Sequence, residues 1–236
     1  MTSSIPELAK RQLDVGTMLH DWEAGQTFWA ETVGLPYSKF EKIGGGVRQH
    51  RFDANGSVIK VNHSRVPMDP LPTIHRRLRI ASSRVTEPRM VHDPEGVEVE
   101  LVPPGHDGII DVEIINATAD LAEARRFWVE GIGGTEIEPG RFRVGDSIVR
   151  CLEEEGLERP AERRAPGFRY LTVQVQHVDE AWPRLVEMGF PGEMAPVSLG
   201  DTARVSFVRD PDGGYLEVSE RAEFTGRPLP TSTSRP

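Results

Sequence analysis

The sequence predicts an α+β fold built from tandem β-α-β-β-β modules, because its most distinctive patterns occur twice in the same order. A tight turn that leads into an alternating strand occurs as Asp93-Pro94-Glu95-Gly96 and again as Asp210-Pro211-Asp212-Gly213. Proline presets φ and glycine tolerates positive φ in such turns. A helix that begins at an aspartate and carries Phe-Trp seven residues later also occurs twice. Repetition of whole supersecondary units indicates a duplicated module.

The first module begins with an alternating strand and an amphipathic helix, which Asp21 caps and Gly34 ends. Asn55-Gly56 is typical of a hairpin between two later strands. Only about ten residues separate the next strand from the Asp93 turn, too few for a helix of ordinary length, so the second half of this module is predicted to be abbreviated. The predicted elements are strand 13–19, helix 22–33, and strands 38–43, 47–53, 57–61, 77–82 and 97–102.

The second module repeats the order after a Pro-Pro-Gly linker at 103–105. It is predicted to contain strand 109–116, a helix from Asp120 that carries Phe127-Trp128, strands 144–151 and 170–175, helix 178–188, and strands 204–208 and 215–219. The predicted domains are a polar leader at 1–12, one domain at 13–104, a second at 108–221, and a disordered tail at 222–236.

Composition limits the classes of partner. The net charge is −9 and no run of basic residues occurs, which argues against nucleic acid and anionic membranes. The single cysteine, Cys151, cannot form a disulfide within the chain and fits a reducing cytoplasm. No stretch approaches 18 consecutive apolar residues. A cytoplasmic protein that takes a small-molecule substrate or ligand is expected.

The two modules resemble the vicinal oxygen chelate superfamily, which includes glyoxalase I, bleomycin-resistance proteins and extradiol dioxygenases. The resemblance is carried by the Asp-capped helix with Phe-Trp, the strand after Gly145-Asp146-Ser147, and the Asp-Pro-Asp-Gly turn followed by Glu217. It covers residues 13–104 and 108–220. It implies two curved sheets, each forming a cup that holds a divalent metal. The fold hosts many chemistries, so the reaction has to be inferred from the residues of the site.

The resemblance also implies four ligand places in each cup. Asp14, Lys60, Arg79 and Glu100 occupy them in the first unit, and Glu113 (or Asp111), Arg150, Tyr170 and Glu217 in the second. None is histidine and three are cations. Catalytic metals of this family are held by imidazole and carboxylate, so no metal cofactor is favoured. Two ion-paired clusters are expected instead: Asp14–Lys60–Glu100 and Glu113–Arg150–Glu217. If a metal binds, Glu113, Tyr170 and Glu217 are the expected ligands, for Mg²⁺, Mn²⁺ or Fe.

The second unit is the better candidate for a pocket, because polar residues alternate along its strands. Thr172, Gln174, Tyr215 and Trp182 are the predicted substrate contacts, although the polar stripe fits a solvated face equally well. Isolated histidines such as His63 and His75 are weaker general-base candidates.

Three functions remain open. The first is an isomerase or lyase that acts next to a carbonyl, with Glu113 or Glu217 as base, Arg150 stabilising an enolate and Tyr170 donating a proton. The second is a non-catalytic protein that sequesters a small molecule, as bleomycin-resistance proteins do. The third, least favoured, is a metal-dependent glyoxalase- or dioxygenase-like enzyme. A homodimer is compatible with all three.

Overall fold

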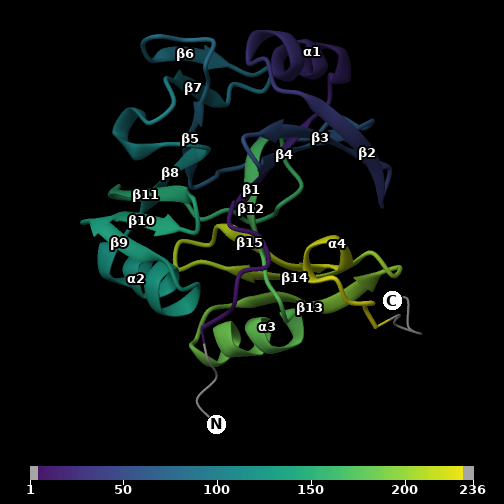
Figure 1. The fold of residues 1–236 in the computed structure, drawn as a ribbon, viewed down its shortest axis with the longest axis vertical. Coiled ribbons are helices and arrows are strands. Elements are labelled where there is room, and N and C mark those ends of the chain that lie inside the picture. Colours follow the sequence, from purple (N-terminus) through teal and green to yellow (C-terminus); the bar gives the residue numbers. More distant parts are fainter. Residues whose placement is uncertain (1–4, 231–236) are drawn as a thin grey trace.

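The computed structural model describes residues 5–230, and two curled β-sheets that lie beside one another form its framework (Figure 1). The larger sheet has eight strands in the order β13-β14-β15-β12-β1-β4-β3-β2. Their bounds are β1 Asp14–Leu19, β2 Tyr37–Gly44, β3 Val47–Ala54, β4 Ser57–Ser64, β12 Gly167–Gln174, β13 Gly192–Leu199, β14 Ala203–Arg209 and β15 Tyr215–Arg221. The α+β class with two curved sheets is therefore confirmed.

The smaller sheet has seven strands in the order β6-β7-β5-β8-β11-β10-β9. Their bounds are β5 His75–Ala81, β6 Arg89–His92, β7 Glu98–Val102, β8 Val112–Thr118, β9 Thr135–Glu138, β10 Arg141–Val144 and β11 Ser147–Glu153. The stretch between β5 and β6 contains no helix, as the short spacing before the Asp93 turn predicts.

Each sheet is assembled from both sequence modules. In the larger sheet, β1 of the first module pairs antiparallel with β12 of the second, with Asp14 opposite Thr172. In the smaller sheet, β5 pairs antiparallel with β8, with Arg79 opposite Glu113. The expectation that units 13–104 and 108–221 each form their own cup is therefore wrong. Each sheet joins one half of the first unit to one half of the second.

The helices repeat as the sequence predicts. The first is α1 (Trp22–Thr27), which continues as a π-helical turn (Phe28–Thr32), and its counterpart is α2 (Leu121–Arg125) with a π-helical turn (Arg126–Gly131). Asp21 accepts from the amide of Ala24, and Asp120 caps α2 in the same way. In both helices the adjacent Phe and Trp rings meet edge to face, with centroids 5.0 Å apart. These rings are core residues.

Three further segments are α3 (Val178–Glu187), a short helix α4 (Ala222–Thr225) and a 3₁₀ turn (His106–Gly108). Strand β13 was not predicted from the sequence, and the prediction of disorder at 222–230 was wrong, since α4 occupies part of that stretch. Residues 231–236 of the predicted tail and 1–4 of the leader lie outside the described residues. The rest of the leader is not free, because Leu8 forms a β-bridge with Val175.

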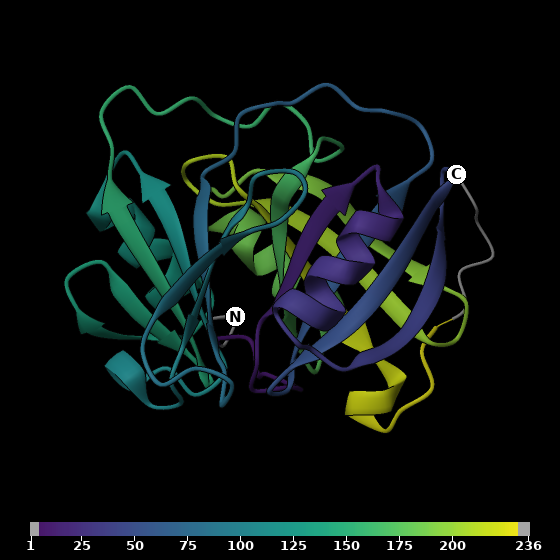
Figure 2. The same ribbon diagram turned by 90° about the horizontal axis from the view of Figure 1, so that it is seen from above.

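Two long connections, β4–β5 and β11–β12, run across the same end of the molecule (Figure 2). The Arg169 side chain, only 2% exposed, holds them together. It donates to the carbonyl oxygen of Leu71 at 3.0 Å and to that of Glu162 at 2.7 Å. No helix in the described part of the chain is long and apolar enough to cross a membrane.

Candidate functional site

A pocket of about 380 Å³ lies over the face of the eight-stranded sheet that carries Lys60 and Asn62 of β4. The neighbouring residues Ile59 and Val61 point to the opposite face and join the hydrophobic core, as strand alternation requires. The pocket is therefore on the polar side of a sheet whose other side packs on helices. Its remaining walls are largely apolar and include Met18, Val47, Met194, Val205 and Phe207.

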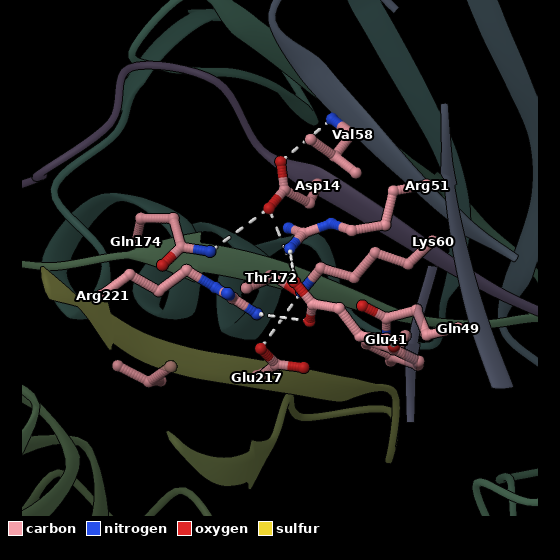
Figure 3. A network of polar contacts seen from close by, with 12 residues as sticks. Asp14, Glu41, Gln49, Arg51, Val58, Lys60, Thr172, Gln174, Glu217 and Arg221 are labelled. Atoms are coloured by element: carbon pink, nitrogen blue, oxygen red, sulfur yellow. Dashed lines mark hydrogen bonds and ion pairs between the residues drawn. The ribbon is translucent and has the colours of Figure 1, made fainter. Parts of the chain in front are cut away.

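The Lys60 ammonium lies at the centre of the polar network on the pocket floor (Figure 3). Its Nζ donates to Thr172 Oγ1 at 2.7 Å and to Glu217 Oε1 at 3.1 Å, and it lies 3.9 Å from Asp14 Oδ2. The side chain is 1% exposed. Burial lowers the pKa of Lys60, while Glu217 and Asp14 favour its charged form.

Asp14 is a structural carboxylate at the base of this network. It is fully buried, pairs with Lys10, and accepts from the backbone amide of Val58 at 3.0 Å and from Gln174 Nε2 at 3.2 Å. Burial alone would raise its pKa, but Lys10 and Lys60 together hold the pKa below its ordinary value. Both oxygens are engaged, so Asp14 orients Lys60 rather than facing a ligand.

Two groups on the pocket floor retain unused hydrogen-bonding capacity. Glu217 binds Lys60 through Oε1, and its Oε2 has no hydrogen-bond partner among the described residues. Tyr170 OH accepts from Gln49 Nε2 at 3.3 Å and from Asn62 Nδ2 at 3.2 Å. Its own proton has no acceptor among residues 5–230, which leaves it available to donate. Burial, with Glu217 nearby, raises the pKa of Tyr170, so the phenol stays protonated at neutral pH.

A second ionic layer lies at the mouth of the pocket. Glu41 accepts from Arg51 at 2.9 Å and lies 3.6 Å from Arg221. Burial would raise the pKa of Glu41, but Arg221 and Arg51 lower it to about 2. Arg51 stands directly opposite Lys60 in the β3–β4 ladder, so this layer and the floor are adjacent. The paired charges fix the rim and leave the floor groups to face the pocket.

The seven-stranded sheet carries a different cluster, in which the charges satisfy one another. Glu113 is fully buried, and its two oxygens accept from Arg79 and Arg141 at 2.6 Å each. Arg79 also binds Glu100 at 2.7 Å and Asp107 at 2.8 Å. Glu113 therefore has no free oxygen with which to remove a proton from a ligand.

The expected Asp14–Lys60 pair is present at 3.9 Å, but the other ion pairs expected from the sequence are not found in the described structure. Lys60 pairs with Glu217 instead of Glu100, because β4 and β15 belong to the same sheet. Glu113 pairs with Arg79 and Arg141, and Arg150 contacts neither Glu113 nor Glu217 in the described structure. The exchange of halves between modules, which sequence parity could not reveal, places Glu217 beside Lys60 and Arg79 beside Glu113. Arg150 shares a sheet with Glu113 but lies opposite Ile115 in the β8–β11 ladder.

The predicted substrate contacts have other partners. Thr172 binds Lys60, and Gln174 binds Asp14. Trp182 lies on α3, packs against the core and donates from Nε1 to the carbonyl oxygen of Phe207. Tyr215 OH donates to the carbonyl oxygen of Ala161 at 3.2 Å. None of these four lines the pocket.

Neither histidine candidate faces the floor of the pocket. His63 is on the face of β4 opposite Lys60 and Asn62, near Trp22. His75 is buried in the smaller sheet, where it stacks on Phe168 and hydrogen-bonds Asn116 at 2.8 Å.

Gln49, Arg51 and Asn62 are among the residues of the site that were not predicted from the sequence. The sequence nevertheless contains patterns that could have indicated these three residues. Asn62 shares the parity of Lys60, and a hairpin at Asn55-Gly56 places Gln49 and Arg51 opposite these two residues.

The site residues do not fit a divalent metal. The Lys60 ammonium contacts the carboxylate that a metal would need, so a second cation there would meet direct repulsion. Within the described chain, no group of three or more His, Cys, Asp or Glu side chains is arranged to hold a metal ion.

The fold and the site together define a class of protein in which tandem α+β modules form a small pocket with a polar floor. Residues 113–218 match the model of the Glyoxalase/Bleomycin resistance protein/Dioxygenase superfamily. This stretch of the chain is similar to that superfamily, as the resemblance of its motifs indicated.

Solved structures of low identity share the fold over 91–92% of this chain. Glyoxalase I from Zea mays is 11% identical, with a TM-score of 0.69, and the match covers 91% of this chain and 95% of that one. The cppA protein from Streptococcus pneumoniae is 12% identical, with a TM-score of 0.58 and coverage of 92% and 100%. Among proteins with curated functions, none matches this sequence. At such identities the likeness concerns the fold alone.

Proposed function

We propose that the chain is a small-molecule enzyme of isomerase or lyase type, which acts next to a carbonyl group without a divalent metal. The observation that carries the proposal is the buried Lys60 ammonium, held against Glu217 on the pocket floor at 3.1 Å. It puts a fixed positive charge where a developing enolate oxygen can be stabilised. Lys60 replaces Arg150 in this role.

The chemistry divides among three side chains that face one pocket. The unpartnered Oε2 of Glu217 removes a proton from the carbon next to the carbonyl. The electron pair of that C–H bond moves into a new C=C bond, and the charge that develops on the carbonyl oxygen is stabilised by Lys60 and by the free proton of Tyr170. Return of the proton to a different carbon or face gives an isomer, and loss of a β-substituent gives a lyase product.

Exchange of the substrate's α-hydrogen for deuterium tests this proposal, whichever product the reaction forms. A panel of carbonyl compounds is incubated with the protein in D₂O and followed by proton NMR. Glu217→Gln is expected to slow exchange by about 10²-fold or more, because it removes the general base. Glu100→Gln is the matched control, since Glu100 holds the corresponding position after the other Asp-Pro turn and binds Arg79. Equal exchange by both variants would refute the assignment.

A sequestering protein is the second candidate, because the pocket walls are largely apolar. In that case wild type and Glu217→Gln would bind the same compounds with similar affinity, and neither would exchange their α-hydrogens. Calorimetry on the two proteins separates this outcome from catalysis. A metal-dependent reaction is the third candidate, and stoichiometric metal in protein purified without chelator would favour it over both.

We also propose that the chain acts in the cytoplasm. The lone Cys151 is buried and therefore suited to a reducing environment. A homodimer is proposed on the exposed edge strand β2, where Tyr37, Phe40 and Ile43 are all more than 40% exposed. Sedimentation equilibrium of wild type and Phe40→Ser measures this directly: loss of association is expected in the variant.

A further inference from the structure

Arg163 is a charged residue of the pocket wall that the proposed reaction does not use. It belongs to the connection between β11 and β12, and its guanidinium lies over the ring of Phe207, 3.7 Å from the centroid. The ring of Tyr215 lies farther away, at 6.0 Å. In the described structure the guanidinium has no hydrogen-bond acceptor and no carboxylate partner.

The other cations around this pocket all have protein partners. Lys60 binds Glu217, Arg221 lies against Glu41, and Arg164 donates to the carbonyl oxygen of Gly45 at 3.0 Å. A guanidinium carries five N–H donors, and inside a pocket their natural acceptor is a planar anion. Arg163 thus differs from its neighbours in having its whole hydrogen-bonding capacity unused.

The chain immediately before Arg163 is held rigidly. Three consecutive carbonyl oxygens, those of Pro160, Ala161 and Glu162, accept hydrogen bonds from buried or half-buried side chains. Arg209 donates to Pro160 at 2.7 Å, Tyr215 to Ala161 at 3.2 Å, and Arg169 to Glu162 at 2.7 Å. On the other side, the bond from Arg164 ties the loop to the β2–β3 hairpin. These bonds fix the backbone that carries Arg163, and the stacking on Phe207 holds its guanidinium, which reduces the entropy lost when it binds a ligand.

Phe207 connects Arg163 to the reactive floor. It is the cross-strand neighbour of Glu217 and makes an edge contact with Tyr170, with ring centroids 5.8 Å apart. A ligand that lies along this ring has a guanidinium at one end and the Lys60–Glu217–Tyr170 group at the other.

We propose that the pocket takes a carboxylate with an apolar body, and that Arg163 is the residue that binds the carboxylate. In combination with the proposed function, on which this part rests, the substrate class becomes an oxo acid: its carboxylate pairs with Arg163, and its carbonyl faces Lys60 and Tyr170. The apolar walls formed by Met18, Met194 and Val205 contact the rest of the molecule.

Binding of phenylpyruvate and of its uncharged methyl ester, measured by calorimetry, tests the proposal. The two probes share the apolar body and the carbonyl and differ in charge. Wild type should bind the acid at least about tenfold more tightly than the ester, as a charge-assisted hydrogen-bonded pair implies. Arg163→Gln should remove that preference and leave ester binding unchanged. Arg163→Lys should restore part of it, because the charge returns without the planar fork.

Arg159→Gln is the matched control, since Arg159 is an exposed residue of the same connection, lies outside the pocket lining, and carries the same charge. It should keep the full preference for the acid. Equal affinity of wild type for acid and ester, absence of binding by the acid, or equal effects of the Arg159 and Arg163 substitutions would overturn the proposal. A protein that binds the acid through Arg163 but shows no Glu217-dependent exchange would sustain it and refute the proposed catalysis instead.

Discussion

The two sheets bury comparable sets of charged residues, yet only one of the two sets leaves groups free for a ligand. In the seven-stranded sheet, two arginines share Glu113 and occupy both of its oxygens. In the eight-stranded sheet, a single lysine is shared between Asp14 and Glu217, and one oxygen of Glu217 remains open. The difference teaches that buried charge alone does not mark a site. A cluster leaves a carboxylate oxygen free for a ligand only where its cations supply fewer hydrogen-bond donors than its carboxylates can accept.

The largest expected effect separates the two clusters by stability. Glu113→Gln should lower the free energy of unfolding by about 3–5 kcal/mol, because it leaves two buried guanidiniums short of their shared counter-charge. Glu217→Gln should cost less, about 1–2 kcal/mol, because Lys60 retains Thr172 and Asp14. Urea unfolding at pH 7 compares the two variants. Equal losses would show that both clusters are structural and would break the distinction.

An effect of intermediate size is expected on the pH dependence of stability, and it differs between the two Asp-Pro turns, one of which lies in each sheet. Burial, with Asp212 nearby, raises the pKa of Asp210 from 3.8 to about 7, and burial raises that of Asp93 to about 6. A raised pKa means that the folded state binds more protons than the unfolded state between pH 4 and these values. Stability should therefore fall as the pH rises through this window.

Substitution by asparagine keeps the oxygen that accepts the turn amides and removes the titration. Asp210→Asn should flatten the fall in stability up to about pH 7, and Asp93→Asn only up to about pH 6. Urea midpoints measured from pH 4 to pH 8 provide the check. A wild-type midpoint that stays constant over this range would contradict the expectation.

The smallest expected effect concerns Arg150, which lies on β11 and has no ionic partner in the described structure. Arg150→Gln should change the free energy of unfolding by less than about 0.5 kcal/mol, as is usual for residues without such contacts. The same urea experiment measures it, with Arg79→Gln as the comparison, since Arg79 binds Glu100, Asp107 and Glu113. A large loss for Arg150→Gln would indicate that this residue belongs to the cluster after all.

Local chemistry made much of this molecule predictable. Alternation places Asp14, Lys60, Tyr170 and Glu217 on the polar face of their strands, and all four meet in one network, directly or through Asn62 and Thr172. The Asp caps, the Phe-Trp pairs and the missing helix before Asp93 follow from spacing alone. These features depend on neighbours in sequence.

The partners of each charge were not predictable, because they depend on which strands pair. The alternation of residues along a strand assigns each side chain to one face of a sheet, but it does not indicate which strands share a sheet. It therefore could not predict that Glu217 lies in the same sheet as Lys60 and that Glu100 lies in the other sheet. Arg163 was not predicted as a site residue for a related reason. It lies in a connection that has no hydrophobic periodicity. The backbone just before it is held by hydrogen bonds from side chains distant in sequence, such as that of Arg209 to the carbonyl oxygen of Pro160, 49 residues away.

The exchange of halves also has a consequence for how the chain must be made. Strand β1 is completed by β12, which follows it by about 150 residues, so the larger sheet cannot close until the chain has been synthesised beyond residue 174. Such long loops make folding slow and leave the unpaired edge of β1 open meanwhile. A protein cut near Gly105 would leave both fragments with half-sheets, and the ligand cup would return only when the two pieces reassociate.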